Sequence, residues 1–197
     1  MLYIISTILL CLLGVFTFIP KFKSVIERHS VGVNFFLTLV ATLVGVLLAI
    51  SITNYEAKQK EKQDVIKLLK SSISSVETCY EYSEELIEYF NNLPKEDELR
   101  VEFYLKNPPP YPEYLDTFLM QNIVSSNLSV TTLSDLNEYL INLKRSRKFD
   151  ALLYLKVLEQ THKLLELEVA YQEGRISEAQ LDLELGAVKN ILTATGS

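Results

Sequence analysis

The sequence predicts an all-α membrane protein with two transmembrane helices, the second of which continues into a long helical stalk, and a small C-terminal helical bundle. Three observations lead to this prediction. Two apolar runs lie within residues 1–53, a heptad pattern follows the second run, and residues 113–197 show helical periodicity with start and stop signals.

The ionisable side chains are concentrated after the apolar region. The chain has 19 Lys and Arg residues against 25 Asp and Glu residues. Only Lys21, Lys23, Arg28 and Glu27 precede residue 54, so the remainder is strongly acidic. Such a surface disfavours general binding to nucleic acid or anionic lipid, and an anionic partner would need a local basic patch.

The first 53 residues are predicted to form a transmembrane hairpin, with spans at about residues 2–19 and 31–53. The first run is short for a span, but it lacks the basic start and small-residue cleavage site of a signal peptide. The second run contains no ionisable side chain. The short loop between them, which Pro20 opens, places both chain ends on the same side of the membrane.

The distribution of basic residues predicts the orientation of the hairpin. Three basic residues lie in the loop between the spans, whereas five lysines follow the second span: Lys58, Lys60, Lys62, Lys67 and Lys70. Because cytoplasmic flanks are enriched in Lys and Arg, the larger cluster predicts a cytoplasmic C-terminal domain. The uncharged N-terminus argues for the opposite orientation.

Both predicted spans contain small residues at helical spacing. In the first these are Thr7, Cys11, Gly14 and Thr17, and in the second Thr38, Ala41, Thr42, Gly45 and Ala49. Small residues allow helix backbones to approach closely in lipid. Two interpretations remain open: the stripes pack the hairpin together, or they join several copies around a pore.

Residues 54–93 are predicted to form a helical stalk. Its apolar seam follows the three-four spacing of a coiled coil, at Ile66, Leu69, Ile73, Val76, Tyr80, Ser83, Ile87 and Phe90. An intramolecular helical bundle would use nearly the same seam. An unbroken helix from Val33 to Leu93 would be roughly 90 Å long at about 1.5 Å per residue, so events at one end could move the other.

A Pro-rich connector at residues 94–112 is predicted to follow the stalk. Pro108, Pro109, Pro110 and Pro112 favour an extended backbone, either as a rigid connector or as a ligand for a proline-binding domain. A short strand is predicted near Val101–Leu105.

Residues 113–197 are predicted to form a cytosolic helical domain. We expect helices at Tyr114–Val124, Thr131–Arg147 and Phe149–Glu173, the last of which stops at Gly174. A capping box of Ser177 and Gln180 starts a final helix that ends near Leu192. The residues expected to be buried together are Leu152, Leu155, Leu158, Leu165, Leu181, Leu185 and Val188.

The sequence contains no recognisable catalytic motif. It has no phosphate-binding glycine loop, no HExxH zinc motif and no paired CxxC. Glu159 and His162 form one half of a di-iron motif, but the second half is missing. We therefore predict no enzyme, no cofactor and no metal site.

One basic cluster stands out in the acidic region. Lys144, Arg145, Arg147 and Lys148 lie at the junction of two predicted helices. They could bind a nucleotide, a short single strand or a phospholipid headgroup, with Tyr139 and Phe149 available to stack on a base. The alternative is that they complement the dipole at a helix C-terminus.

Two spans, a helical stalk and a small helical domain without catalytic motifs together resemble the membrane effectors of bacterial phage-defence systems of the Hailong type. The resemblance implies a homo-oligomeric channel in the bacterial inner membrane, opened by a nucleotide signal and depolarising the cell. The alternative function is a membrane-anchored scaffold that recruits a cytosolic partner protein.

Overall fold

The computed structural model describes Ile8 and residues 30–194, with side chains described as far as residue 189. These residues form helices and no strand, which confirms the all-α prediction. The elements are α3 (Ser30–Asn92), η2 (Glu98–Arg100), α4 (Phe103–Lys106), α5 (Tyr114–Leu119), α6 (Asn122–Asn127), α7 (Val130–Ser146), α8 (Ala151–Gln172) and α9 (Glu178–Ala194). The first predicted span, at residues 2–19, lies outside the described residues apart from Ile8, as do Thr7, Cys11, Gly14 and Thr17.

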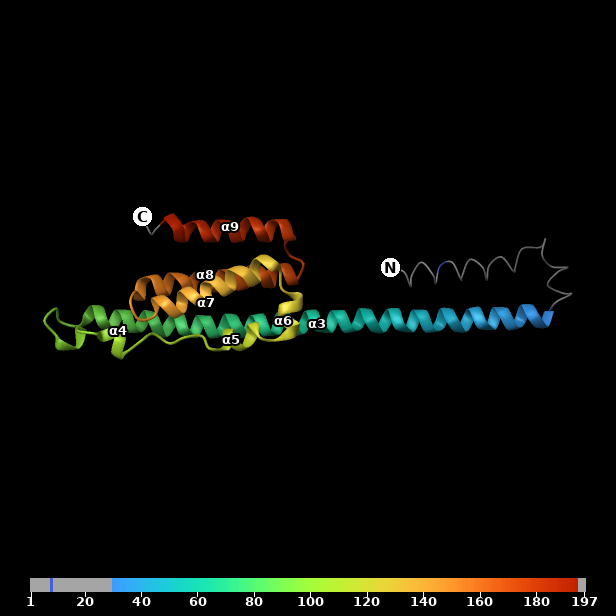
Figure 1. Cartoon of the computed structure of the whole chain (residues 1–197), viewed down its shortest axis with the longest axis horizontal. Helices are drawn as coiled ribbons and strands as arrows, with labels where there is room; N and C mark the ends of the chain where they lie inside the picture. Colours follow the sequence, from blue (N-terminus) through green and yellow to red (C-terminus); the bar gives the residue numbers. More distant parts are fainter. Residues whose placement is uncertain (1–7, 9–29, 195–197) are drawn as a thin grey trace. The chain divides into compact units, whose positions relative to one another are not determined.

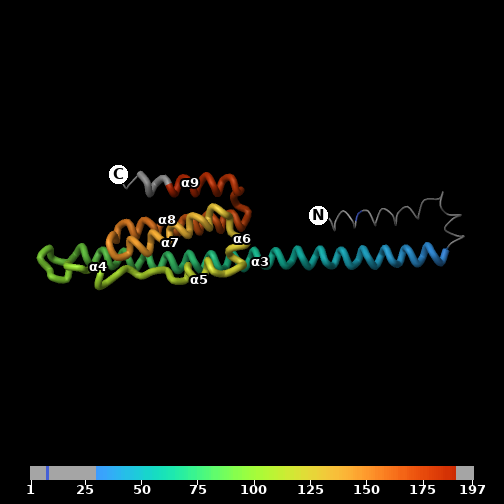
Figure 2. The backbone as a smooth tube through the Cα atoms, in the orientation of Figure 1, coloured from blue at the N-terminus to red at the C-terminus, as the bar shows by residue number. Residues whose placement is uncertain are grey.

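The chain divides into two compact units, Met1–Lys60 and Glu61–Ser197, and helix α3 contributes residues to both. Figure 2 shows this helix as a continuous tube. Within the first unit, α3 is long and apolar enough to cross a membrane. Val40 is buried in this segment. Most of the large apolar side chains of α3 there are exposed, as expected for a surface that faces lipid or other helices: Val31, Phe35, Phe36, Leu39, Leu43, Val46, Leu48, Ile50 and Ile52.

Three threonine hydroxyls of this apolar segment are satisfied inside the helix. The hydroxyls of Thr38, Thr42 and Thr53 each donate a hydrogen bond of 2.9 Å to the carbonyl oxygen four residues earlier. Such bonds matter in lipid, where no water is available to satisfy a hydroxyl. A methyl group added at Gly45 would meet no described atom within 4 Å, so this side of the helix is open to a partner.

The second unit is a helical bundle in which α7 and α8 lie between the C-terminal part of α3 and α9 (Figure 1). All four helices contribute to one hydrophobic core. Its members include Val65, Leu69, Val76, Leu136, Leu143, Leu158, Leu165, Leu181 and Leu185.

The seam of α3 packs into this core, as the intramolecular interpretation of the heptad pattern expects. Its buried positions are Val65, Leu69, Ser72, Val76, Cys79, Ser83 and Ile87. Four of the eight predicted seam residues are among them, whereas the other four are only half-buried: Ile66, Ile73, Tyr80 and Phe90. The buried stripe is displaced because α5, α7 and α8 together cover a broader face than one coiled-coil partner would.

The predicted strand near Val101–Leu105 is wrong, because an aromatic cluster folds this segment into short helices. Asp97 caps η2 by accepting a hydrogen bond from the Leu99 amide at 2.8 Å. The ring of Phe103 packs 5.2 Å from that of Phe90. Arg100 lies 4.3 Å above the Phe90 ring and donates to the carbonyls of Phe90 and Leu93, which satisfies acceptors that the end of α3 leaves open.

The predicted helix boundaries after residue 113 are largely correct. Gly174 has a φ of +75°, and the amides of Gly174 and Arg175 bond to the carbonyls of Tyr171 and Ala170, as in a Schellman motif. The Ser177 amide donates to Gln180 Oε1 at 3.0 Å and the Gln180 amide to Ser177 Oγ at 3.3 Å, which confirms the capping box. The single helix expected at Tyr114–Val124 is instead divided into α5 and α6.

The predicted core is correct except at the start of α8. Leu158, Leu165, Leu181 and Leu185 are fully buried, and Leu155 and Val188 are half-buried, but Leu152 is 65% exposed. The inward positions of this first turn are instead Ala151 and Tyr154, because the Tyr154 hydroxyl reaches the proline segment.

Candidate functional site

The structure divides the four predicted anion-binding cations between two faces of the α7 end. Lys144 and Arg147 lie on one face, towards α5 and the proline segment. Lys144 Nζ is 2.9 Å from Asp116 Oδ1 and 5.3 Å from the centre of the Tyr111 ring. Arg147 Nε donates a hydrogen bond to the Pro109 carbonyl. Both side chains therefore have partners within their own chain.

The proline segment explains these contacts. A proline has no amide hydrogen to donate, but its carbonyl still needs a donor when it is buried. Arg147 from α7 supplies one for Pro109, and the Tyr154 hydroxyl from α8 supplies another for Pro110. Burial raises the pKa of Tyr154, so its hydroxyl remains a donor. The segment is thus a rigid connector within the domain, bound much as a separate proline-rich ligand would be.

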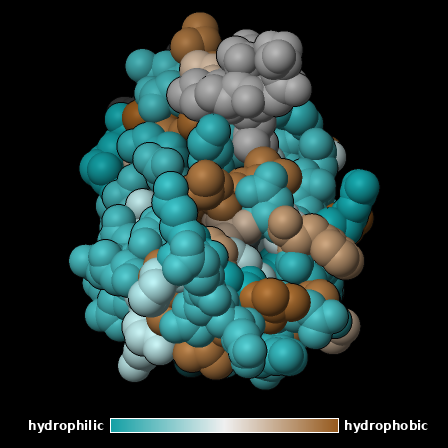
Figure 3. Space-filling view, turned by 90° about the vertical axis from the view of Figure 1, so that its left-hand side faces the viewer, coloured by the Kyte–Doolittle hydropathy of each residue, from teal (hydrophilic) through white to brown (hydrophobic). Residues whose placement is uncertain are grey.

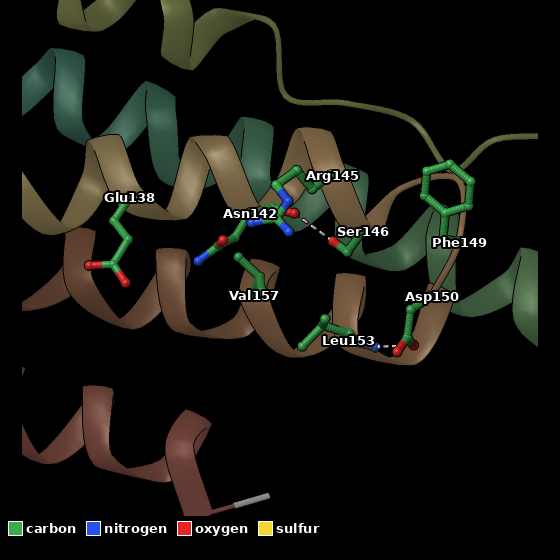
Figure 4. Close-up of a pocket in the computed structure, with 8 residues that line it drawn as sticks. All are labelled: Glu138, Asn142, Arg145, Ser146, Phe149, Asp150, Leu153 and Val157. Carbon is green, nitrogen blue, oxygen red and sulfur yellow. Dashed lines mark hydrogen bonds between the residues drawn. The ribbon is translucent and has the colours of Figure 1, made fainter. Parts of the chain in front are cut away.

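Arg145 lies on the other face of α7 and lines a groove of about 590 Å³ between α7 and α8 (Figure 4). Four of the residues that line it come from α7, two from the turn and two from α8. They are Glu138, Asn142, Arg145, Ser146, Phe149, Asp150, Leu153 and Val157.

Most polar groups of this groove are already used within the fold. Asp150 caps α8 by accepting from the Leu153 amide at 2.9 Å, and Ser146 Oγ donates to the Asn142 carbonyl at 2.8 Å. Glu138 accepts from Lys189 Nζ at 2.7 Å, and this bond and a second one to Asp135 raise the pKa of Lys189. Across the described residues, no salt bridge is recorded for Arg145 or Lys148.

The predicted aromatic neighbours of the cluster differ in accessibility. Phe149 is 84% exposed at the turn, whereas Tyr139 is only 1% exposed in the core. The expectation that Tyr139 stacks on a base is therefore wrong. What remains accessible is a surface with two cations beside exposed apolar side chains, which favours a partner that offers both negative charge and apolar contact.

The division of the cluster leads to a first prediction. Arg147→Ala should lower the free energy of unfolding by about 1.5–3 kcal/mol, because it leaves a buried carbonyl without its charged donor. Arg145→Ala, the matched control, should change it by no more than about 0.5 kcal/mol. Thermal unfolding of the purified full-length variants measures both values. Equal effects of the two substitutions on the free energy of unfolding would contradict the placement of Arg147 and Arg145 on different faces of α7.

A buried polar network around Glu168 was missed at the sequence level. This carboxylate is fully buried and accepts hydrogen bonds from the Ser129 amide (3.2 Å), Ser129 Oγ (3.0 Å), Thr132 Oγ1 (2.7 Å) and Gln172 Nε2 (2.8 Å). Gln172 also donates to the Asn127 carbonyl at 2.8 Å. The network joins the end of α6, the N-terminus of α7 and the C-terminal end of α8.

The location of the negative charge explains how this carboxylate is accommodated. Helix N-termini favour anions, and Ser129 is the N-cap of α7. The one available sequence signal was spacing, since Glu168 follows the buried Leu164 and Leu165 by four and three residues on α8. A buried position for a glutamate is rare enough that the pattern alone did not identify it.

His162, one of the two residues of the predicted half di-iron motif, connects α8 to α3. Its Nε2 lies 3.0 Å from Glu77 Oε1, and its Nδ1 lies 3.8 Å from Glu166 Oε2. Within the described part of the chain, no group of three or more His, Cys, Asp or Glu side chains could hold a metal ion. The predicted absence of a metal site stays a prediction.

The accessible features of the described domain are therefore the α7–α8 groove, the two cations Arg145 and Lys148, and the exposed faces of its helices. The chain matches no protein-family model, no curated protein and no solved structure.

Proposed function

We propose that the protein is a membrane-anchored, homo-oligomeric effector in which α3 transmits binding events in the helical domain to the bilayer, where copies of the chain form a ligand-gated ion pore. One observation supports this proposal. Helix α3 runs without a break from Ser30 to Asn92, and it contains both the apolar segment and the seam residues of the domain core.

The continuity of this helix is more than an anchor requires. A flexible linker would tether the domain equally well, and glycine or proline would mark it. Helix α3 contains no proline, and it contains no glycine after Gly45. A displacement or rotation of the seam residues is therefore passed along hydrogen-bonded backbone, as in other transitions that shift a whole helix.

A pore built from this segment would be lined by small and hydroxylated side chains. No residue from Val31 to Thr53 is ionisable. Close packing of copies along Ala41, Gly45 and Ala49 would leave backbone and the Thr38 and Thr42 side chains near the axis. Such a pore closes by a hydrophobic constriction, which dewets when its diameter falls.

The signal for this effector would bind at the accessible side of the basic cluster. Arg145, Lys148 and the exposed Phe149 offer two charges and one aromatic face to a nucleotide or short nucleic acid. Lys144 and Arg147 add less, because their intrachain partners compete.

A same-length replacement tests transmission. Replacing residues 58–61 with four glycines should abolish depolarisation of cells, because glycine costs roughly 1 kcal/mol per residue in a helix interior relative to alanine. Replacing the same residues with four alanines keeps both the helix and its register, and it should preserve depolarisation. A membrane-potential dye measures the effect, with equal amounts of membrane-bound protein confirmed for each variant.

Full depolarisation by the glycine variant would exclude transmission through α3. That outcome would favour the second candidate function, a membrane-anchored scaffold, which needs only a tether. The mixed apolar and basic groove between α7 and α8 supports this candidate, because such a surface is typical of a protein-binding site.

A further inference from the structure

We propose that copies of the chain associate head to tail through the helical domain, with the tip of the α7–α8 hairpin of one copy bound to the outward face of α3 of the next. This inference deepens the proposed self-assembly and rests on it, but it does not depend on conduction. The contact uses Arg145, Lys148 and Phe149, so a neighbouring copy bound there and a signal bound there exclude one another. The two surfaces are named here the hairpin tip and the acidic stripe.

The hairpin tip combines cations with exposed apolar side chains. It consists of Ile141, Arg145, Lys148, Phe149 and Leu152, and three of these are large apolar residues that are 58%, 84% and 65% exposed. Scattered exposed apolar residues are normal, but three of them near one helix junction that also carries two cations favour an interaction surface. Figure 3, which views the domain from the end where α4 lies, shows hydrophobic patches separated by hydrophilic residues on that face.

The acidic stripe lies on the side of α3 that faces away from the core. Glu81, Glu85 and Glu88 repeat at helical spacing with Tyr82 and Tyr89 beside them, and all five are exposed. Glu81 also borders a pocket beside α8, and one face of the Tyr89 ring stacks on Phe103 at 6.0 Å, so Glu85, Glu88 and Tyr82 are the most open members. The seam positions Val76, Ser83 and Ile87 are on the opposite side. Nowhere in the described structure is a salt bridge recorded for these three carboxylates, and like charges at this spacing repel one another. A cation from outside the chain would relieve that repulsion.

The two surfaces match in charge and in chemistry. Two cations of the tip face three carboxylates of the stripe, while Phe149 and Leu152 meet the rings of Tyr82 and Tyr89. Aromatic residues and arginine are the side chains most enriched in protein interfaces. Complementary charge selects this pairing over tip-to-tip or stripe-to-stripe contact, where like charges meet.

The pairing cannot form within one chain. Helices α7 and α8 pack on the core side of α3, whereas Glu85 and Glu88 lie on its opposite, exposed side, so the tip of the same copy does not reach them. Contact between two different surfaces is heterologous, and repeated heterologous contacts close into a ring when the rotation between copies allows it. A ring is the symmetry that a pore of identical helices requires.

Cross-linking of full-length protein in membranes tests the geometry. We introduce Lys156→Cys beside the tip in one sample and Thr78→Cys beside the stripe in another, both at exposed positions and in a Cys11→Ala background. When the Lys156→Cys and Thr78→Cys variants are expressed together in the same cells, a short bismaleimide should link one copy of each into a dimer. Each variant expressed alone should give no more linkage than the background protein, whose only cysteine is Cys79. Linkage of Lys156→Cys copies to one another would overturn the head-to-tail arrangement.

Charge reversal tests the pairing itself. Arg145→Glu with Lys148→Glu should reduce the cross-link at least tenfold, and Glu85→Lys with Glu88→Lys should do the same. Reversing all four residues in one chain should restore the cross-link, because opposite charges meet again. Since all four side chains are exposed, the helical content of the protein should not change.

Three further outcomes would overturn the pairing. If charge reversal at the tip abolishes the cross-link and charge reversal at the stripe of the same chain does not restore it, the tip binds another partner, such as anionic lipid. If the protein is oligomeric and its cross-linking yield is unchanged by every charge reversal, this interface is rejected but the proposed function is not. A monomeric wild-type protein would reject both.

Discussion

Replacement of Glu168 with alanine should lower the free energy of unfolding of the helical domain by about 3 kcal/mol or more. The substitution removes the acceptor of four hydrogen bonds, from the Ser129 amide and hydroxyl, the Thr132 hydroxyl and the Gln172 amide group. These donors are buried or half-buried, so water cannot replace the carboxylate without opening the structure. The end of α6 and the start of α7 should therefore loosen together.

The single cysteine of the domain provides the measurement. Cys79 is buried, and its burial raises the pKa of the thiol, so a maleimide dye should label it slowly until the domain unfolds. In a Cys11→Ala background, dye fluorescence on heating reports unfolding of this domain alone. Glu166→Ala is the matched control, because Glu166 lies two residues away on α8 and makes only surface ion pairs. A difference below about 0.5 kcal/mol between the two variants would contradict the structural role of Glu168.

Gly45→Leu should convert the proposed oligomer into monomers. In lipid, helices associate by close packing of backbones, and a leucine at the centre of a small-residue stripe prevents that approach. Within the described chain the added side chain meets nothing within 4 Å of its Cβ, so the fold of each copy should survive. The oligomeric state in mild detergent, measured by light scattering, shows the outcome.

Gly32→Leu is the control for this substitution. Gly32 is also open, and at about 100° per residue it lies on the side of α3 opposite Gly45. It should leave the oligomer intact. An oligomer unchanged by Gly45→Leu, with the helical domain still folded, would confine the stripe of Ala41, Gly45 and Ala49 to packing within the hairpin.

The local signals in the sequence predicted most of the fold. The uncharged run at residues 31–53, the stop at Gly174 and the capping box at Ser177 all depend on residues within one or two helical turns. The alternation of leucines on α7, α8 and α9 likewise identified most of the core. Each of these patterns reflects hydrogen bonding or burial along a single helix, which periodicity describes directly.

The errors arise where a side chain satisfies a distant polar group. The Arg147 and Tyr154 side chains bond to carbonyls 38 and 44 residues earlier in the chain, and Glu168 bonds to Ser129, 39 residues earlier. No local pattern shows such a partner. For this reason Arg147 and Lys144 were predicted to be free cations. The segment Val101–Leu105 was predicted to be a strand because the packing of Phe103 against Phe90 is not visible in the local sequence.

The packing of α3 against α8 has a consequence for synthesis of the protein. Glu77 precedes its partner His162 by 85 residues, and Lys70 precedes Glu173 by 103. At roughly 5–20 residues per second, the ribosome takes about 5–20 s to complete the helix that covers the seam of α3. During that interval the seam presents its heptad face to any neighbouring nascent chain. Two ribosomes on one message would bring two such seams close together. The seam that packs inside one copy of the mature fold could then pair with the seam of a second copy, which would lead to exchange of α3 between copies.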